Sequence, residues 1–346
     1  MDFSNIVIEG FSPNCLMGVI GAVAKYKYNE SNINRLFFHH SYVYEKKEEV
    51  KYLEETEGLN VWFSRELPIK KEEFSKRLMD YYGLCHYTAA YSEFDDMLEV
   101  IQCLNNANEP VMVEIDFFYM KKHRYYQKVH DQHMMIIYNI DFENRYFEVC
   151  EAVFGYIRIG FEEYYEYFKE VKFNRNRDIF IMILKRAEKD KNNTSYIENF
   201  IKDIDKSLNN LTIKNTQTLG LEAFNNFSED FIHLIKSDKC SNNFFVPGMW
   251  VFMCDCLNNA KFITEFKNVC TDFYSKELDE IKKCFNKSNR KWFTITTALN
   301  QVYKQNADDF VKVFHELMEL DKIIVDRLQT LNTQLVDYSH RKKENI

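Results

Sequence analysis

The sequence predicts an α+β domain at residues 1–186, followed by an all-α helical bundle at residues 195–340. Before residue 185, helical and β-like segments are mixed, whereas after it every apolar pattern recurs at helical steps. The stretch KRAEKDKNNTS at residues 185–195 is polar and ends in Asn, Thr and Ser, which suits a linker that leads into a helix N-cap. Only nine glycines and four prolines occur in 346 residues, which favours long helices and few elaborate loops.

The first predicted helix begins at Pro13, because serine at position 12 is a preferred N-cap and proline a preferred first helical residue. From Cys15 to Tyr26 it is apolar on nearly every side, which is typical of a buried central helix. Short β-like runs then predict four strands, and a turn at 141–144 joins the middle two into a hairpin. These strands are expected at 111–118, 134–140, 145–149 and 178–184.

The C-terminal half has the apolar spacing of packed helices. Its last helix is the clearest, with apolar residues at steps of three and four: Phe310, Val313, Leu317, Leu320, Ile324, Leu328, Leu331 and Leu335. Similar apolar stripes occur near 195–210, 218–237, 247–285 and 292–305. We therefore expect a bundle of four to six helices.

Charge and cysteine content narrow the class of function. The net charge of −8 without a basic cluster argues against a nucleic-acid or anionic-membrane partner. No leader-like N-terminus and no apolar run of about 18 residues is present, so we expect a cytoplasmic protein. The nine cysteines lack a metal-ligand spacing, which predicts buried reduced thiols and neither a metal nor another cofactor.

Cys15 is the candidate nucleophile. At the start of a buried helix, unpaired backbone N–H groups and the helix dipole favour negative charge, which stabilises a thiolate. The same N–H groups can hold the oxyanion that forms when a thiolate attacks a carbonyl. A cysteine at a helix start is also a common packing residue, so this position alone does not identify a nucleophile.

His133 and Glu151 complete a candidate triad. His133 lies at the mouth of a predicted strand, where an imidazole can project towards a helix start and act as a base. The following hairpin brings Glu151 back opposite His133, where its carboxylate could orient the imidazole. Asp141, Asn139 and Asp131 are the alternative orienting residues.

Two segments resemble the papain-like superfamily, most closely the BtrH-like acyltransferase domain and the double-glycine leader peptidases. They are IEGFSPNCLMGVIGAVAKY around Cys15 and EPVMVEIDFFYMKKHRYYQKVHDQHMMIIYNIDFENRYFEVCEAVFG around His133. The resemblance covers roughly residues 5 to 185 and implies a papain-like fold, with an N-terminal helix packed on an antiparallel sheet. Glu151-Ala152 stands where the family has Asp-Pro, and Glu9 where it has an oxyanion-binding glutamine.

The substitution at position 9 leaves Asn14 and backbone N–H groups as replacement oxyanion donors. Ser12, Tyr119 and His130 are further candidates for binding residues. The loop aromatics from Phe117 to Tyr126, together with Phe37, Phe38 and Tyr42 to Tyr44, could line a water-poor channel, although most are expected to be ordinary core residues.

The resemblance implies a cysteine-dependent acyltransferase of natural-product biosynthesis. Such an enzyme takes an acyl or peptidyl group from the phosphopantetheine thioester of a carrier protein and passes it to a small amine, forming an amide. A cysteine peptidase or amidase is the first alternative, and a non-catalytic papain-like binding module is the second.

Overall fold

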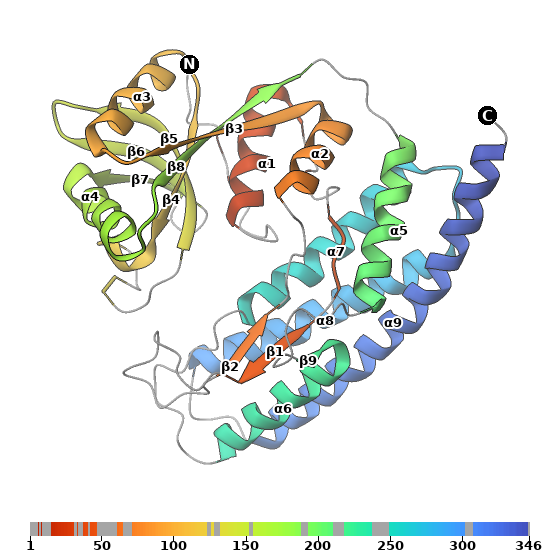
Figure 1. The fold of residues 1–346 in the computed structure, drawn as a ribbon. Helices are drawn as coiled ribbons and strands as arrows, with labels where there is room; N and C mark the ends of the chain where they lie inside the picture. The colour runs from red at the N-terminus through yellow and green to blue at the C-terminus, as the bar shows by residue number, and fades with distance from the viewer. Residues whose placement is uncertain are drawn as a thin grey trace. The chain divides into compact units, whose positions relative to one another are not determined.

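The computed structural model describes residues 6, 8, 15–30, 33, 37–40, 42–46, 61–64, 71–122, 126–127, 132–151, 155–187, 193–209, 218–236, 249–301 and 307–344. The chain forms two compact units (Figure 1). Unit 1 comprises Met1–Ile33 and Lys71–Lys191, and unit 2 comprises Asn34–Lys70 and Asn192–Ile346. The third change of unit, after Lys191, falls at the predicted linker. Residues 34–70, which the sequence analysis assigned to the N-terminal domain, instead group with the C-terminal helices.

Unit 1 is built on a six-stranded antiparallel sheet in the order β3-β8-β4-β5-β6-β7. The α+β class predicted for this region is therefore confirmed. The strands, in chain order, are β3 (Leu84–Tyr91), β4 (Val111–Asp116), β5 (Gln132–Asp141), β6 (Tyr146–Glu151), β7 (Gly155–Gly160) and β8 (Ile179–Arg186).

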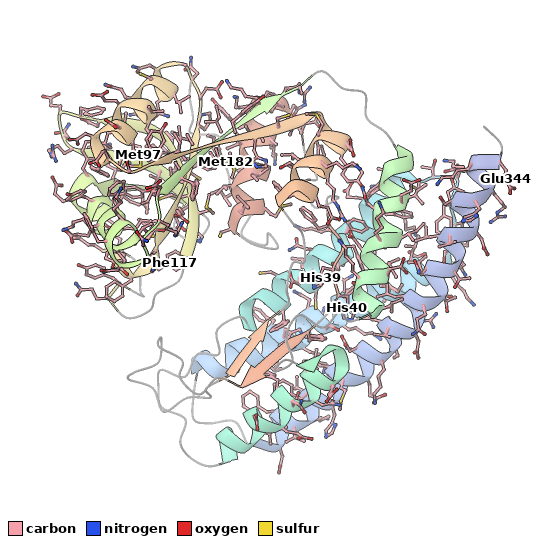
Figure 2. The ribbon with its side chains drawn as sticks, viewed as in Figure 1. His39, His40, Met97, Phe117, Met182 and Glu344 are labelled. Carbon is pink, nitrogen blue, oxygen red and sulfur yellow. The ribbon has the colours of Figure 1, made fainter. Side chains whose placement is uncertain are left out.

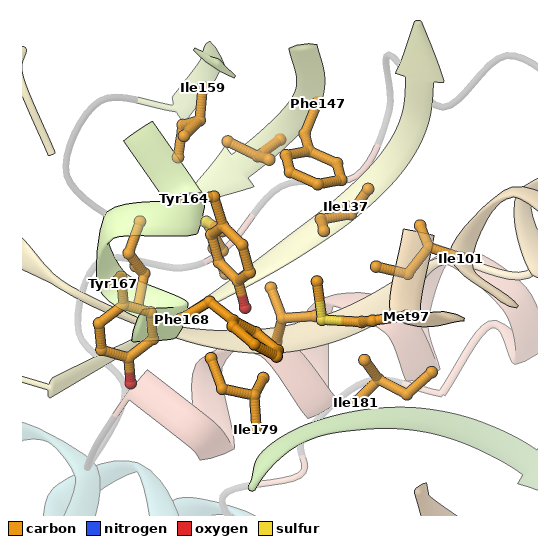
Figure 3. Close-up of a cluster of buried hydrophobic side chains, with 14 of the residues drawn as sticks. Met97, Ile101, Ile137, Phe147, Ile159, Tyr164, Tyr167, Phe168, Ile179 and Ile181 are labelled. Atoms are coloured by element: carbon orange, nitrogen blue, oxygen red, sulfur yellow. The ribbon is translucent and has the colours of Figure 1, made fainter. Parts of the chain in front are cut away.

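Helices cover both faces of this sheet. The helices of unit 1 are α1 (Cys15–Tyr28), α2 (Lys71–Tyr82), α3 (Phe94–Asn106) and α4 (Phe161–Lys169). Figure 1 shows α3 and α4 on one side of the sheet and α1 on the other. Strand residues alternate between the two sides, so the odd-numbered apolar residues of β4 and β5 pack with α3 and α4 in one buried cluster (Figure 3).

Three of the predicted strands are present as β5, β6 and β8, and the predicted turn joins β5 to β6. The strand predicted at 111–118 ends earlier, at Asp116, because the side chain of Asp116 accepts a hydrogen bond from the Phe118 N–H and caps a 3-10 turn at Phe117–Tyr119. Strands β3 and β7 were not predicted. β3 lacks a clear alternation of apolar residues, and β7 is short and bounded by glycines.

Unit 2 contains the predicted helices and, in addition, a small sheet. The helices are α5 (Asn193–Asn209), α6 (Gly220–Lys236), α7 (Met249–Val269), α8 (Lys276–Gln301) and α9 (Ala307–Glu344). The sheet has the order β2-β1-β9 and joins β2 (Val61–Ser64), β1 (Val43–Lys46) and β9 (Thr218–Leu219). The prediction of an all-α second domain was therefore wrong, because strands from residues 34–70 pair with β9.

The boundaries of two predicted helices also differ. The stripe predicted over 247–285 is divided after Val269, and α8 begins where Ser275 caps its first turn by accepting a hydrogen bond from the Glu277 N–H. Residues 292–301 of the stripe predicted at 292–305 are the end of that same helix. An apolar stripe continues across such a break, because both helices bury one face against the same core.

Residues 37–40 and Tyr42 are anchored inside unit 2 by side chains of α5, α7 and α9. The backbone N–H groups of Phe38 and His40 donate to Asp203 and Ser207, and Asn259 bonds both the N–H and the C=O of His39. Figure 2 shows His39 and His40 among these helices. Phe37, Phe38 and Tyr42 are buried here, and Phe38 packs against Phe200, Phe262 and Phe285. They are core residues of unit 2, as was expected for most of the aromatics.

Candidate active site

Helix α1 places Cys15 at its first residue, where the backbone N–H groups of the first turn have no partner within the helix. The helix is buried along most of its length, as its apolar sequence predicts. Cys15 itself is half-buried, and it is a free thiol. This position suits a nucleophile, because the sulfur lies next to the positive end of the helix dipole.

Strands β5 and β6 bring His133 and Glu151 together. His133 lies opposite Ile115 of β4, and its side chain is 9% exposed. On the other side of β5, Ile136 pairs with Cys150, so Glu151 falls opposite Met135 and diagonal to His133. The imidazole Nε2 lies 3.1 Å from Glu151 Oε2, and the glutamate is 1% exposed.

The Cys15 thiol lies near the same imidazole and interacts electrostatically with it. Burial opposes the charged imidazolium, but the hydrogen bonds and negative charges of Cys15 and Glu151 outweigh it and raise the pKa of His133 to about 9. At neutral pH the imidazole is therefore protonated.

The alternative orienting residues have other partners. Asp141 binds the backbone and side-chain nitrogens of Asn144 within the β5–β6 turn, at 2.8 and 2.9 Å. Asn139 donates to Glu148 at 3.0 Å on the exposed part of the same hairpin. Asp131 lies outside the described residues. Glu151 is therefore the described carboxylate that contacts His133.

The predicted oxyanion and binding residues are only partly described. Ser12, Asn14 and His130 lie outside the described residues, so their roles stay predictions. Tyr119 hydrogen-bonds Glu170 and packs against Tyr167 of α4. Burial and the negative charges of Glu170 and Asp116 raise the pKa of Tyr119 to about 12. These contacts attach Tyr119 to the end of α4, and none of them involves the triad.

Phe117 contacts the triad and was not singled out for this role by the sequence analysis. Its ring lies on the His133 imidazole, with a centroid distance of 4.5 Å and an interplanar angle of 31°. Figure 2 shows Phe117 at the end of β4. The sequence signal that could have revealed it is Asp116, since an aspartate near a strand end can cap the following turn.

The assembled groups have the composition of a cysteine nucleophile site. The Cys15 sulfur at a helix start lies near the His133 imidazole, and the buried Glu151 carboxylate contacts Nε2 of the same ring. Such a set can attack a carbonyl carbon, transfer a proton to the leaving group and stabilise the charged imidazole throughout.

Other kinds of site are not apparent in the described part of the chain. There, no group of three or more His, Cys, Asp or Glu side chains is arranged to hold a metal ion. Among the described residues, no helix combines the length and apolar character required to cross a membrane. The sequence matches no known family model and no curated protein.

Proposed function

We propose that the protein is a papain-like cysteine acyltransferase. It takes an acyl or peptidyl group from a carrier-protein thioester and transfers it to a small amine, forming an amide in natural-product biosynthesis. The observation that supports this proposal is the buried imidazole of His133, held between the Cys15 sulfur and the Glu151 carboxylate. A buried helix against an antiparallel sheet fits a papain-like arrangement. Free thiols at all eight described cysteines fit a reducing compartment such as the cytoplasm.

In the first step, the Cys15 thiolate attacks the carbonyl carbon of the carrier thioester. The oxyanion that forms lies near the first-turn N–H groups of α1, which can donate to it. The bond between the carbonyl carbon and the carrier sulfur then breaks, and the proton of the His133 imidazolium passes to the departing thiolate. The products are an acyl group on Cys15 and a carrier protein with a free thiol.

In the second step, the amine nitrogen attacks the same carbonyl carbon and gives up a proton to the now neutral His133. The bond to the Cys15 sulfur breaks, the amide leaves, and the thiolate–imidazolium pair is restored. Glu151 keeps the imidazole oriented in both steps. Neither step requires a metal ion, a nucleotide or an oxidant, because the thioester supplies the free energy for amide formation.

Intact-mass spectrometry tests the proposal directly. The full chain, mixed with a carrier protein bearing an acetyl-phosphopantetheine group, is expected to gain one acetyl group, and Cys15→Ala is expected to gain none. Cys85→Ala is the matched control, because Cys85 is likewise partly buried but lies in β3. Addition of a small primary amine should discharge the adduct and release the acetamide.

Three outcomes would contradict the proposal. Release of acetate instead of the acetamide in excess amine would favour a peptidase or amidase. Absence of any adduct, together with slow alkylation of Cys15 by iodoacetamide at neutral pH, would favour a binding module. An adduct formed with acetyl-N-acetylcysteamine but not with the loaded carrier would exclude the carrier protein as the acyl donor.

A further inference from the structure

The face of the His133 imidazole is covered by the ring of Phe117. Its centroid lies 4.5 Å from that of the imidazole, at an interplanar angle of 31°, so the two rings overlap closer to face to face than edge to face. Phe117 is 6% exposed and belongs to the buried cluster between the sheet and α4. It therefore contacts the face of the imidazole, whereas Glu151 contacts the ring nitrogen Nε2.

Phe117 is held in this position by a charged pair at the end of β4. Asp116 is fully buried. One of its oxygens accepts a hydrogen bond from the Phe118 N–H at 3.0 Å, and the other accepts one from Arg175 at 2.9 Å. Arg175 follows the π-helical turn Glu170–Asn174. Its ion pair with Asp116 therefore connects this segment to the 3-10 turn that contains Phe117. The 3-10 turn is thus fixed by a hydrogen bond and an ion pair on opposite sides of one carboxylate.

We propose that Phe117 is a positioning residue for His133: its ring fixes the plane of the imidazole and favours the protonated form. The inference rests on the proposed function, because it assigns His133 as the acid and base of that reaction. An aromatic face attracts a cation that lies over it, and the attraction is stronger where water is excluded. The ring also blocks rotation of the imidazole away from the line between the sulfur and the carboxylate.

A purely structural role for Phe117 has a different signature. Loss of core packing would destabilise the unit in proportion to the buried volume that is removed. It would leave the protonation of His133 unchanged, since Cys15 and Glu151 would still lie beside the imidazole. The ionisation of His133 therefore distinguishes the two roles.

The test is an NMR titration of the His133 imidazole in the full chain, with His133→Gln used to assign its signal among the nine histidines. Phe117→Leu should lower the midpoint by about half to one pH unit, because the π-face is removed and the apolar bulk is largely kept. Phe117→Tyr restores an aromatic face and should titrate like the wild type. Phe147→Leu is the matched control, because Phe147 is buried in the same cluster and contacts Phe161 and Tyr164.

An unchanged midpoint in Phe117→Leu would overturn the inference, as would an equal fall in Phe147→Leu. If the leucine variant does not fold, Phe117→Met replaces it, since methionine fills irregular space without a ring and predicts the same fall. The titration needs no turnover. A shifted midpoint without acyl transfer would therefore refute the proposed function alone, and acyl transfer with an unshifted midpoint would refute the inference alone.

Discussion

Among the described residues, each unit contains one buried histidine paired with a carboxylate, and the two pairs differ in their surroundings. In unit 1, His133 Nε2 lies 3.1 Å from Glu151, and its other contacts include a thiol and an aromatic face. In unit 2, His40 Nε2 lies 3.0 Å from Asp321, which also accepts a hydrogen bond from Tyr42. His40 is part of the segment whose backbone is anchored by α5 and α7. The nearby sulfur of Cys15 distinguishes the first pair from the second.

The largest expected difference is between His133→Ala and His40→Ala. Loss of the proposed acid and base should lower acyl transfer per folded molecule by about a thousandfold or more, and it should also destabilise the protein by about 2 kcal/mol, because the buried Glu151 loses its partner. Loss of His40 should leave the rate per folded molecule unchanged and destabilise the protein by about 2 kcal/mol, because it removes a buried polar partner. Single-turnover mass spectrometry and urea unfolding on both variants measure the two effects. A large fall in the single-turnover rate of folded His40→Ala would contradict the distinction between the two histidines.

Glu151→Gln should have a smaller effect, about tenfold on acyl transfer, because glutamine can still accept a hydrogen bond from the imidazole. The carboxylate charge helps to raise the pKa of His133 to about 9. In the wild type the rate should therefore fall above about pH 9, as the imidazolium is lost. Removal of the charge lowers this pKa, so the alkaline limb of the pH–rate profile should move to lower pH. Full activity in Glu151→Ala would mean that another residue orients the imidazole.

Asp203→Ala tests whether the anchored segment of unit 2 contributes to stability without affecting Cys15. The substitution leaves the buried N–H of Phe38 without its acceptor, which should destabilise the protein by about 1–3 kcal/mol. Iodoacetamide should still alkylate Cys15 at the wild-type rate under native conditions, because Asp203 and Cys15 belong to different units. Asp205→Ala, two residues further along the same helix, serves as a matched control at a less buried carboxylate. Slower alkylation in Asp203→Ala but not in Asp205→Ala would contradict independence of the units.

The smallest expected effect is that of Arg175→Gln. Removal of the guanidinium leaves the Asp116 cap in place but weakens the hold on the Phe117 turn, which should lower acyl transfer about threefold or less. Arg177→Gln is the control, because Arg177 pairs with Glu114 and not with Asp116. Equal effects of the two substitutions on the rate would show that the Asp116–Arg175 pair has no particular influence on His133.

The contact between His133 and Glu151 could be predicted because it is local: one hairpin joins the two residues, and the hydrogen bond between them is present. The position of Cys15 near His133 does not follow from local geometry, because α1 and β5 are far apart in the sequence. The contribution of Phe117 could not be read from the strand pattern, because it depends on the Asp116 cap ending β4 two residues before the predicted end. The assignment of residues 34–70 failed for a related reason. Asp203, Asn259 and Asp321 bind this segment from positions 165 to 279 residues further along the chain.

The chain passes between the two units three times, after Ile33, Lys70 and Lys191. During synthesis, Phe38 and Tyr42 leave the ribosome long before the helices that cover them. Both side chains therefore stay exposed until most of the polypeptide has been synthesised. A fragment cut at residue 186 would keep the whole sheet of unit 1 and expose these aromatics permanently. Attempts to isolate unit 1, with its six-stranded sheet, should instead replace residues 34–70 with a short flexible linker.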